Sequence, residues 1–147
     1  SHKLNVHEFH REKSARFTEF AGWEMPVSYG SSVEEHLHTR LHCSLFDVSH
    51  MGEIVVHGPD ASKFLDFILT NSVSNVEPGK AIYSPFCYEN GATVDDLIAY
   101  KKSDEEYFLC VNASNILKDF QHFSQYVARF DCTIENVSNA FGQIAVQ

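Results

Sequence analysis

Apolar positions along the chain alternate between helical and strand spacing, and this pattern predicts most of the elements. A capping box at Ser32 and Glu35 starts a predicted helix in which an apolar side chain recurs at every fourth position to about residue 44, giving it one apolar face. The β-branched run 54–56 predicts a strand that ends at Gly58-Pro59, and residues 61–69 return to helical spacing. A short helix is also expected at residues 6–17.

A hairpin and three further elements follow. Glu89-Asn90-Gly91 is a strong turn signal, because an Asn-Gly pair adopts positive φ at little cost. It separates two strand-like runs, residues 81–88 and 93–100. The remaining elements are a strand at 107–111, a helix capped by Ser114 with its apolar face at Ile116, Phe120, Phe123 and Val127, and a strand at 133–137.

The order of elements between residues 53 and 138 is therefore β-α-β-β-β-α-β. Hairpins between helices that pack on one face indicate an α+β fold with an antiparallel sheet. The N-terminal and C-terminal segments of the chain do not fit this predicted α+β layer as well. Residues 1–52 are expected to be helical and irregular, with a loop at residues 21–26 that a glycine and a proline punctuate. Residues 144–147 begin an apolar strand.

Composition narrows the class of protein. The 147 residues are 44% hydrophobic, which is enough for a packed core and excludes wholesale disorder. The chain has 11 Lys and Arg and 20 Asp and Glu, which gives a net charge of -9. Because it also lacks any run of basic residues, binding to nucleic acid or to an anionic membrane is not expected. No apolar run approaches the roughly 18–20 residues of a membrane span. We expect a soluble protein.

The cysteines and histidines form no complete metal or disulfide pattern. The four cysteines are widely spaced without a C-x-x-C pair, so we expect a reducing, intracellular setting. His38 and His42 are four residues apart on a predicted helix and could share a metal, but a zinc site needs a third or fourth ligand. Neighbouring helix positions point about 100° apart, so Cys43 cannot face His42 as a nucleophile and is interpreted as a packed small residue.

The Asp95-Asp96 pair is the first candidate for chemistry. It lies inside residues 93–100, which otherwise predict a strand, where aspartate is disfavoured. Side chains alternate along a strand, so one carboxylate must face the packed side or a cleft. Such a carboxylate is either part of a structural hydrogen-bond network or perturbed for function, and the residues alone leave both interpretations open. Residues 47–53 and 112–115 are also polar, and are explained as a helix–strand connection and a helix cap.

Four segments of the chain resemble the T-protein family of the glycine cleavage system. They are residues 20–26 (Phe-Ala-Gly-Trp-Glu-Met-Pro), 46–53 (Phe-Asp-Val-Ser-His-Met-Gly-Glu), 94–98 (Val-Asp-Asp-Leu-Ile) and 111–113 (Val-Asn-Ala). The first two segments are long and specific, and the resemblance runs across nearly the whole chain. They favour T-protein over the dimethylglycine- and sarcosine-oxidising enzymes and the iron–sulfur assembly factor that share its fold.

The resemblance implies part of a larger three-domain, folate-binding fold. Residues 1–52 and 139–147 would be discontinuous parts of the first domain, and residues 53–138 would form the second. The third domain of the family has no counterpart here. The chain is therefore interpreted as an amino-terminal fragment that is inactive by itself.

The resemblance also implies a function, that of a tetrahydrofolate-dependent aminomethyltransferase. Such an enzyme moves the methylene of an aminomethyl group from the lipoyl arm of the H-protein to tetrahydrofolate and releases ammonia. The alternative is a folate-binding regulatory or assembly module without transferase activity, and a histidine-rich metal-binding domain is a third hypothesis. The expected partner is the H-protein, without nucleic acid or membrane, and the bacterial cytoplasm is preferred to the mitochondrial matrix.

The family's site residues match positions of this chain. The catalytic carboxylate would be Asp96, which would hold the reduced pterin and accept the proton at its nitrogens. Alternation along the strand independently groups Asp96 with Ile98 and Tyr100, and places Asp95 on the opposite face, where we interpret it as structural. No metal ligand is expected. The cofactor-binding residues implied by the resemblance are Met51, Tyr83, Ile98, Tyr100, Cys110 and Asn112.

Overall fold

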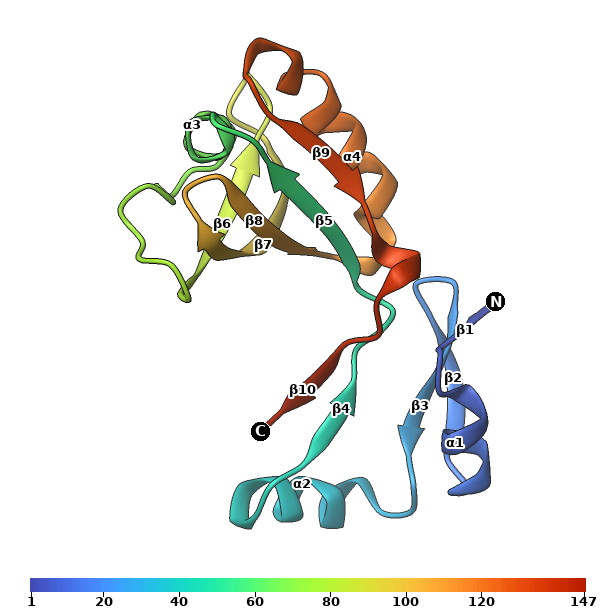
Figure 1. Cartoon of the computed structure of the whole chain (residues 1–147). Coiled ribbons are helices and arrows are strands. Elements are labelled where there is room, and N and C mark those ends of the chain that lie inside the picture. The colour runs from blue at the N-terminus through green and yellow to red at the C-terminus, as the bar shows by residue number, and fades with distance from the viewer. The chain divides into compact units, whose positions relative to one another are not determined.

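The computed structural model describes all of residues 1–147 and divides them into two compact units (Figure 1). The first unit consists of residues 1–50 and 142–147, and the second consists of residues 51–141. The sequence predicts the corresponding boundaries at 52/53 and 138/139. Each unit has its own sheets and is described separately.

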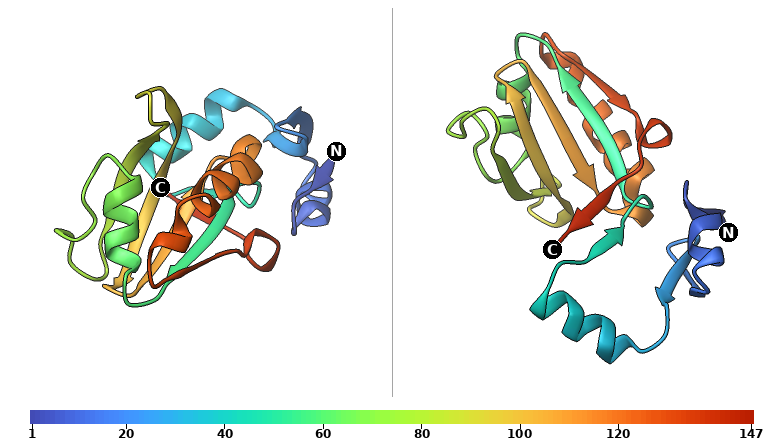
Figure 2. Two further views of the ribbon diagram at one scale, coloured as in Figure 1. Left: turned by 90° about the horizontal axis from the view of Figure 1, so that it is seen from above. Right: turned by 60° about the horizontal axis from the view of Figure 1, so that its bottom comes forward.

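The second unit is an antiparallel sheet with two helices on one of its faces (Figures 1 and 2). Its elements are β5 (Gly52–His57), α3 (Ala61–Ile68), β6 (Ala81–Cys87), β7 (Thr93–Ser103), β8 (Glu106–Val111), the 3-10 turn η1 (Ala113–Asn115), α4 (Ile116–Ser124), the 3-10 turn η2 (Val127–Arg129), β9 (Thr133–Asn136) and the 3-10 turn η3 (Ser138–Ala140). The strand order is β6-β7-β8-β5-β9, and each neighbouring pair is antiparallel. The α+β class and the β-α-β-β-β-α-β order predicted from the sequence are confirmed.

Alternate strand residues form the core between this sheet and the helices. The fully buried side chains from both layers belong to one cluster, which includes Ile54, Val56, Leu109 and Val111 from the strands and Phe64, Leu65 and Phe123 from the helices. Phe123 of α4 meets Phe64 of α3 edge to face, with 6.1 Å between the ring centroids. Burial of one such side chain contributes about 1.5–3 kcal/mol to the free energy of unfolding. The opposite face of the sheet is left for other contacts.

The predicted hairpin joins β6 to β7. Gly91 adopts a φ of +84°, and the backbone N–H of Ala92 donates to the side-chain oxygen of Asn90 at 3.0 Å, as expected for an Asn-Gly turn. The register shifts just after the turn, where Cys87 pairs with Thr93 and Phe86 pairs with Asp95. The extra residue between these pairs is Val94, so β7 starts with a β-bulge.

The first unit contains two small sheets and two helices. Its elements are β1 (His2–Lys3), α1 (His7–Glu12), β2 (Arg16–Phe20), β3 (Trp23–Ser28), α2 (Ser32–Leu41), β4 (Leu45–Asp47) and β10 (Ile144–Val146). Strand β3 lies between β1 and β2, and β10 pairs with β4 in antiparallel fashion. The strand expected at residues 144–147 is thus present, and its pairing with β4 joins the two sequence segments of this unit.

The expectation of one helix over residues 6–17 is wrong. Helix α1 ends at Glu12, and Ser14 adopts a φ of 61°, which no helix accommodates. The chain then continues as strand β2 rather than as helix. The apolar residues of this stretch do not follow a helical period, and the strand takes the second half of it.

The expectation of a loop at residues 21–26 is also wrong. Ala21 and Gly22 make a tight turn with positive φ, and β3 starts directly after them. Pro26 is tolerated inside β3 because β1 pairs only with Trp23 and Glu24. Beyond those two residues β3 has a free edge, and a proline without an N–H costs little there.

Helix α2 is present as predicted, but its surroundings differ from the expectation. The predicted cap Ser32 is already helical, and the N-cap is Ser31, whose Oγ accepts a hydrogen bond from the backbone of Glu34 at 3.3 Å. The apolar face is exposed, at 67% for Val33 and 73% for Leu41. Cys43, which the sequence suggests is packed, is exposed. The spacing of apolar residues predicts helix α2 correctly. Whether its apolar face is buried depends on the segments that pack against the helix, which the spacing does not specify.

The N-cap of α4 lies one residue later than predicted. Ser114 lies inside the 3-10 turn η1, so it does not cap α4, and Asn115 occupies the N-cap position. The side chain of Asn115 makes no capping bond to the helix and is directed instead to the carboxylate of Asp95. A residue type that commonly caps helices is used here for a tertiary contact.

Candidate functional site

The sheet face opposite the helices gathers most of the predicted site residues. Directly paired residues on antiparallel strands project to the same side of a sheet. Tyr83 on β6 pairs with Ile98 on β7, and Ile98 pairs with Cys110 on β8, so these three form one row across the sheet. Tyr100 lies on the same side, two residues further along β7. Tyr83 and Tyr100 are 56% and 40% exposed, so the row presents aromatic surface on this face.

Asp96 lies on the same face and is held at both of its carboxylate oxygens. The phenol of Tyr83 donates to Oδ2 at 2.9 Å, and the side-chain amide of Asn112 donates to Oδ1 at 2.8 Å. The pKa of Tyr83 is raised because its hydroxyl donates to Asp96, whose negative charge also disfavours a phenolate. Two neutral donors thus orient this carboxylate without forming an ion pair, and leave lone pairs on both oxygens free.

Met51 and Asn112 flank the ends of two paired strands. Gly52 of β5 pairs with Val111 of β8, and the two site residues are their immediate neighbours in the sequence. Gly52 must lack a side chain, because a Cβ there would lie 2.4 Å from the side chain of Ile116 at the start of α4. The close approach of α4 to β5 therefore depends on this glycine.

Asp95 is directed toward α4 rather than toward the open face. Its Oδ1 accepts from the amide of Asn112 at 3.0 Å, and its Oδ2 accepts from the amide of Asn115 at 2.7 Å. Burial alone would raise the pKa of Asp95, but hydrogen bonds from the backbone of Asp96 and from the two amides hold it below its usual value. Asn112 is the shared element, since its Nδ2 donates to both aspartates.

Glu53 is a member of the row that the sequence analysis did not single out. It pairs with Cys110, so the row runs from Tyr83 through Ile98 and Cys110 to Glu53. The side chain is 1% exposed, and neither carboxylate oxygen has a hydrogen-bond donor. Burial raises the pKa of Glu53 to about 7. The available signal is a glutamate directly before the apolar run 54–56, because alternation with Ile54 excludes it from the helix-covered core.

Asp119 is a second carboxyl group that the sequence analysis did not single out. It lies on α4 and is 0% exposed, and neither of its carboxyl oxygens has a hydrogen-bond partner. Burial, followed by the influence of the Asp95 carboxylate, raises the pKa of Asp119 to about 8. Its position between Ile116 and Phe123 on the apolar side of the predicted helix was the signal.

The first unit holds a chain of polar contacts among Asp47, His10 and Tyr29. His10 Nε2 lies 2.8 Å from Asp47 Oδ2, and the opposite ring nitrogen contacts the Tyr29 hydroxyl. The order carboxylate–imidazole–hydroxyl is the same as in a catalytic triad. Burial and the charge of Asp47 raise the pKa of Tyr29, however, so the phenol keeps its proton. We interpret this chain as a structural tie between α1, the end of β3 and β4.

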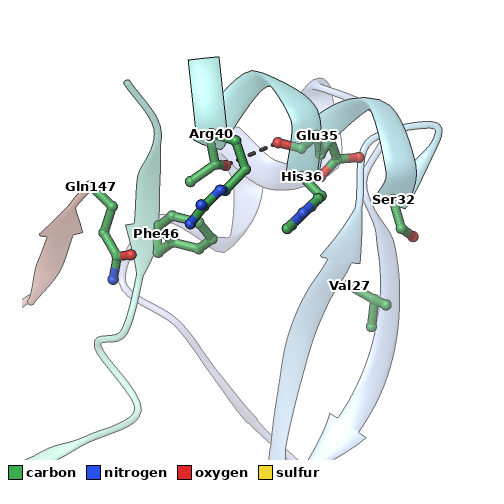
Figure 3. Close-up of a pocket in the computed structure, with 8 residues that line it drawn as sticks. Val27, Ser32, Glu35, His36, Arg40, Phe46 and Gln147 are labelled. Atoms are coloured by element: carbon green, nitrogen blue, oxygen red, sulfur yellow. Dashed lines mark hydrogen bonds between the residues drawn. The ribbon is translucent and has the colours of Figure 1, made fainter. Parts of the chain in front are cut away.

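A pocket of about 650 Å³ also lies in the first unit (Figure 3). Phe46, Arg40 and Gln147 line it, and Thr39 donates from its hydroxyl to the Glu35 carbonyl at 2.9 Å beside it. None of the predicted site residues lines this pocket. The rings of His38 and His42 are 4.9 Å apart, and no group of three His, Cys, Asp or Glu residues has a metal-binding arrangement.

Comparison with known proteins identifies the family. The sequence matches the GCVT N-terminal domain over residues 6–147. The chain belongs to the GCVT family. This membership confirms the resemblance that residues 20–26, 46–53, 94–98 and 111–113 indicate.

Curated GCVT relatives are longer than this chain. The aminomethyltransferase of Listeria welshimeri is 47% identical over 145 residues, which are 99% of this chain and 40% of the relative. That of Lysinibacillus sphaericus is 49% identical over 140 residues, which are 95% of this chain and 38% of the relative. The chain therefore spans about 40% of the length of the relatives it matches.

A solved GCVT structure has the same fold. The crystal structure of glycine cleavage system aminomethyltransferase T from Bartonella henselae superimposes with a TM-score of 0.93 at 35% identity, and covers 99% of this chain and 40% of that chain. The α+β chain thus corresponds to a part of a larger fold, as the resemblance implies. Within the chain itself, none of the helices has the length and apolar composition of a membrane span.

Proposed function

We propose that the second unit supplies a folate-binding wall of a tetrahydrofolate-dependent aminomethyltransferase. This enzyme transfers methylene from an aminomethyl-lipoyl H-protein to tetrahydrofolate and releases ammonia. The observation that supports the proposal is the geometry at Asp96, an oriented carboxylate beside aromatic and apolar side chains on an open sheet face. Membership of the GCVT family links this geometry to folate chemistry.

The row Tyr83–Ile98–Cys110, with Tyr100 beside it, fits a flat heterocycle with polar edges. Small-molecule sites combine apolar and aromatic walls with a few placed polar groups. The two tyrosine rings offer a face for stacking, and Ile98 supplies apolar surface between them. Tetrahydrofolate supplies the nitrogens that accept the one-carbon unit, and these residues would hold its ring against the sheet.

Asp96 would bind the ring nitrogens and take up the proton that they lose as the carbon is transferred. General bases need hydrogen-bond reach to the proton and a free lone pair. Tyr83 and Asn112 leave both oxygens of Asp96 with unused lone pairs while fixing their direction. Asp95 is engaged by Asn115 and Asn112 away from this face, so its role would be structural.

Met51 and the lipoyl-bearing H-protein complete the proposal. Met51 precedes β5 next to Asn112 in register, where a flexible thioether can adapt to the edge of a bound ring. The H-protein would present the aminomethyl group, and the bacterial relatives favour the bacterial cytoplasm as the setting. The 147-residue chain by itself should have little transferase activity, since it spans about 40% of its relatives.

The experiment is a hybrid enzyme in which residues 1–147 replace the matching part of the Listeria welshimeri aminomethyltransferase. The hybrid is incubated with aminomethylated H-protein and tetrahydrofolate, and ammonia and methylenetetrahydrofolate are measured together with folate affinity. We expect folate-dependent release of ammonia. Binding of folate without transfer would support the alternative of a folate-binding module, and absence of both would overturn the proposal.

A further inference from the structure

The first unit leaves exposed the kind of apolar surface that the second unit buries. Helices α3 and α4 pack apolar residues against their sheet, and α3 alone has four buried residues. Helix α2 carries a similar apolar stripe, formed by Val33, Leu37 and Leu41, but none of its residues is buried. A helix of ten residues is only marginally stable in water without tertiary packing. Helix α2 therefore lacks the partner that its sequence pattern requires.

A second exposed apolar surface lies on the sheet formed by β4 and β10. Leu45 pairs with Val146, and directly paired residues of antiparallel strands project to the same side. Ile144, two residues before Val146, projects to that side as well, and all three side chains are exposed. These three residues are called the β4–β10 patch. The sheet has only two strands, which are marginally stable without a third strand or a covering layer.

The side of α2 opposite its apolar stripe is not filled either. A cavity of about 650 Å³ lies there, lined by Glu35 and Thr39 of α2 and by Phe46 of β4 (Figure 3). Gln147, which follows β10, also lines this cavity, and its backbone exchanges two hydrogen bonds with that of Ser44. Strand β10 thus runs to the edge of the cavity, and α2 lacks close packing on both sides.

The relatives carry additional chain next to these surfaces. The match spans 40% of the Listeria welshimeri aminomethyltransferase and 40% of the Bartonella henselae chain, so 60% of each lies outside it. Because the matching family model is an N-terminal domain, this remainder lies mainly on the carboxyl side of the position that matches Gln147. A second copy of this chain is a poorer occupant, because it would present the same cavity and not a segment that fills one.

We propose that the α2 stripe and the β4–β10 patch form a docking surface for the carboxyl-terminal remainder of a GCVT chain. The remainder would add a strand to a free edge of the two-stranded sheet and cover Leu45, Ile144 and Val146 with apolar side chains. The surface would also accept the remainder as a separate polypeptide, because strand pairing and apolar burial need no peptide bond between the two parts. The proposal is independent of folate, since the candidate folate face belongs to the second unit.

The first test coexpresses the 147-residue chain with a tagged polypeptide, made of the part of the Listeria welshimeri enzyme that follows the match. Size-exclusion chromatography with light scattering should show a 1:1 complex. Leu45→Asp places a charge in the β4–β10 patch and should weaken the complex at least about tenfold. Leu117→Asp is the matched control, because Leu117 on α4 of the second unit is as exposed as Leu45, and it should leave binding unchanged.

The second test needs no separately folded partner. Amide hydrogen exchange is compared between the 147-residue chain and the hybrid enzyme, in which the same residues are joined to the remainder. The backbone amides of α2, β4 and β10 should exchange at least about tenfold more slowly in the hybrid. Those of α3 should change little, because the apolar face of this helix is already buried in the chain alone.

Several results would overturn the proposal. Equal exchange of the α2 and β10 amides in the two proteins does so, as does the absence of a complex on coexpression. A complex that Leu45→Asp leaves as tight as the wild type would show that the remainder docks elsewhere. Self-association of the chain that Leu45→Asp abolishes, without binding of the remainder, would assign the patch to a second copy. None of these measurements uses folate, so a failure here leaves the proposed function standing.

Discussion

The hydroxyl of Tyr83 donates to Oδ2 of Asp96 across the β6–β7 pair at 2.9 Å, so an aromatic wall residue also orients the central carboxylate. Tyr83→Phe keeps the ring and removes only this donor. In the hybrid enzyme we expect folate affinity to change little and turnover to fall about tenfold, since a hydrogen bond to a charged group is lost. Steady-state rates over a range of folate concentrations separate the two effects. Tyr88→Phe, on the hairpin, is the matched control and should leave both values unchanged.

The two neighbouring aspartates should respond differently to the same substitution. Asp96→Asn keeps the shape but removes the basicity, so turnover of the hybrid should fall on the order of 10²–10⁴-fold. Asp95→Asn weakens the hydrogen bonds to Asn112 and Asn115 and should lower the free energy of unfolding by about 1–3 kcal/mol. Rates and thermal melting of both variants are compared. Normal turnover of Asp96→Asn would contradict the assignment of the catalytic carboxylate.

The stability that Glu53 and Asp119 contribute should be lost as the pH rises from about 4 to about 8. Burial raises the pKa of Glu53 to about 7 and, with the nearby Asp95, that of Asp119 to about 8. Both groups ionise near pH 4 in an unfolded chain. Between these values the folded state binds more protons than the unfolded state, so stability is lost with rising pH and levels off above about 8.

Urea unfolding at a series of pH values checks this prediction. Glu53→Gln and Asp119→Asn should each flatten part of the profile, because an amide does not titrate. Glu135→Gln, at an exposed position of β9, is the control and should leave the slope unchanged. A profile that neither substitution of a buried acid alters would show that both groups are already ionised in the folded protein.

The core between α3 and α4 offers a direct test of the second unit. Phe123→Ala removes a fully buried ring that meets Phe64 edge to face, and should cost about 3–5 kcal/mol of unfolding free energy. Leu117→Ala on the same helix is the control, because Leu117 is 71% exposed and its truncation should cost under about 0.5 kcal/mol. Equal effects of the two variants would contradict the packing described.

Metal removal should leave the protein unchanged. His38 in α2 and His42 at its C-cap have no third ligand, and no group of three His, Cys, Asp or Glu has a metal-binding arrangement. A structural zinc ion requires a closed set of about four ligands. Addition of a chelator should therefore not alter the melting temperature. A large drop that zinc reverses would show that a metal site exists.

The spacing of apolar residues along the chain is sufficient to predict the elements of the second unit, because these elements are regular. The turn between β6 and β7 is specified by Asn90 and Gly91 alone. Alternation along residues 93–100 correctly placed Asp96, Ile98 and Tyr100 on one side of the strand. It could not give the register of β7 against its neighbours, which is a property of pairs of strands. The row from Tyr83 to Glu53 therefore becomes visible only in the folded sheet.

The failures have specific physical causes. The sequence predicts a loop where β3 forms, because Gly22 and Pro26 normally end regular structure, and only the shortness of β1 makes this proline acceptable. Glu53 and Asp119 were missed because a charged residue in an amphipathic segment is usually solvated. Their burial is set by segments distant in the sequence; η3, for example, contributes the Ser138 hydroxyl that accepts from the backbone N–H of Glu53.

Strand β3 carries Trp23, the only tryptophan of the chain, and it lies in the first unit. The second unit contains tyrosines, among them Tyr83 and Tyr100 on the candidate site, but no tryptophan. Tryptophan emission thus reports on one unit and tyrosine absorbance is dominated by the other. The protein carries two natural optical labels, so the melting of each unit can be followed separately in a single sample without attaching a dye.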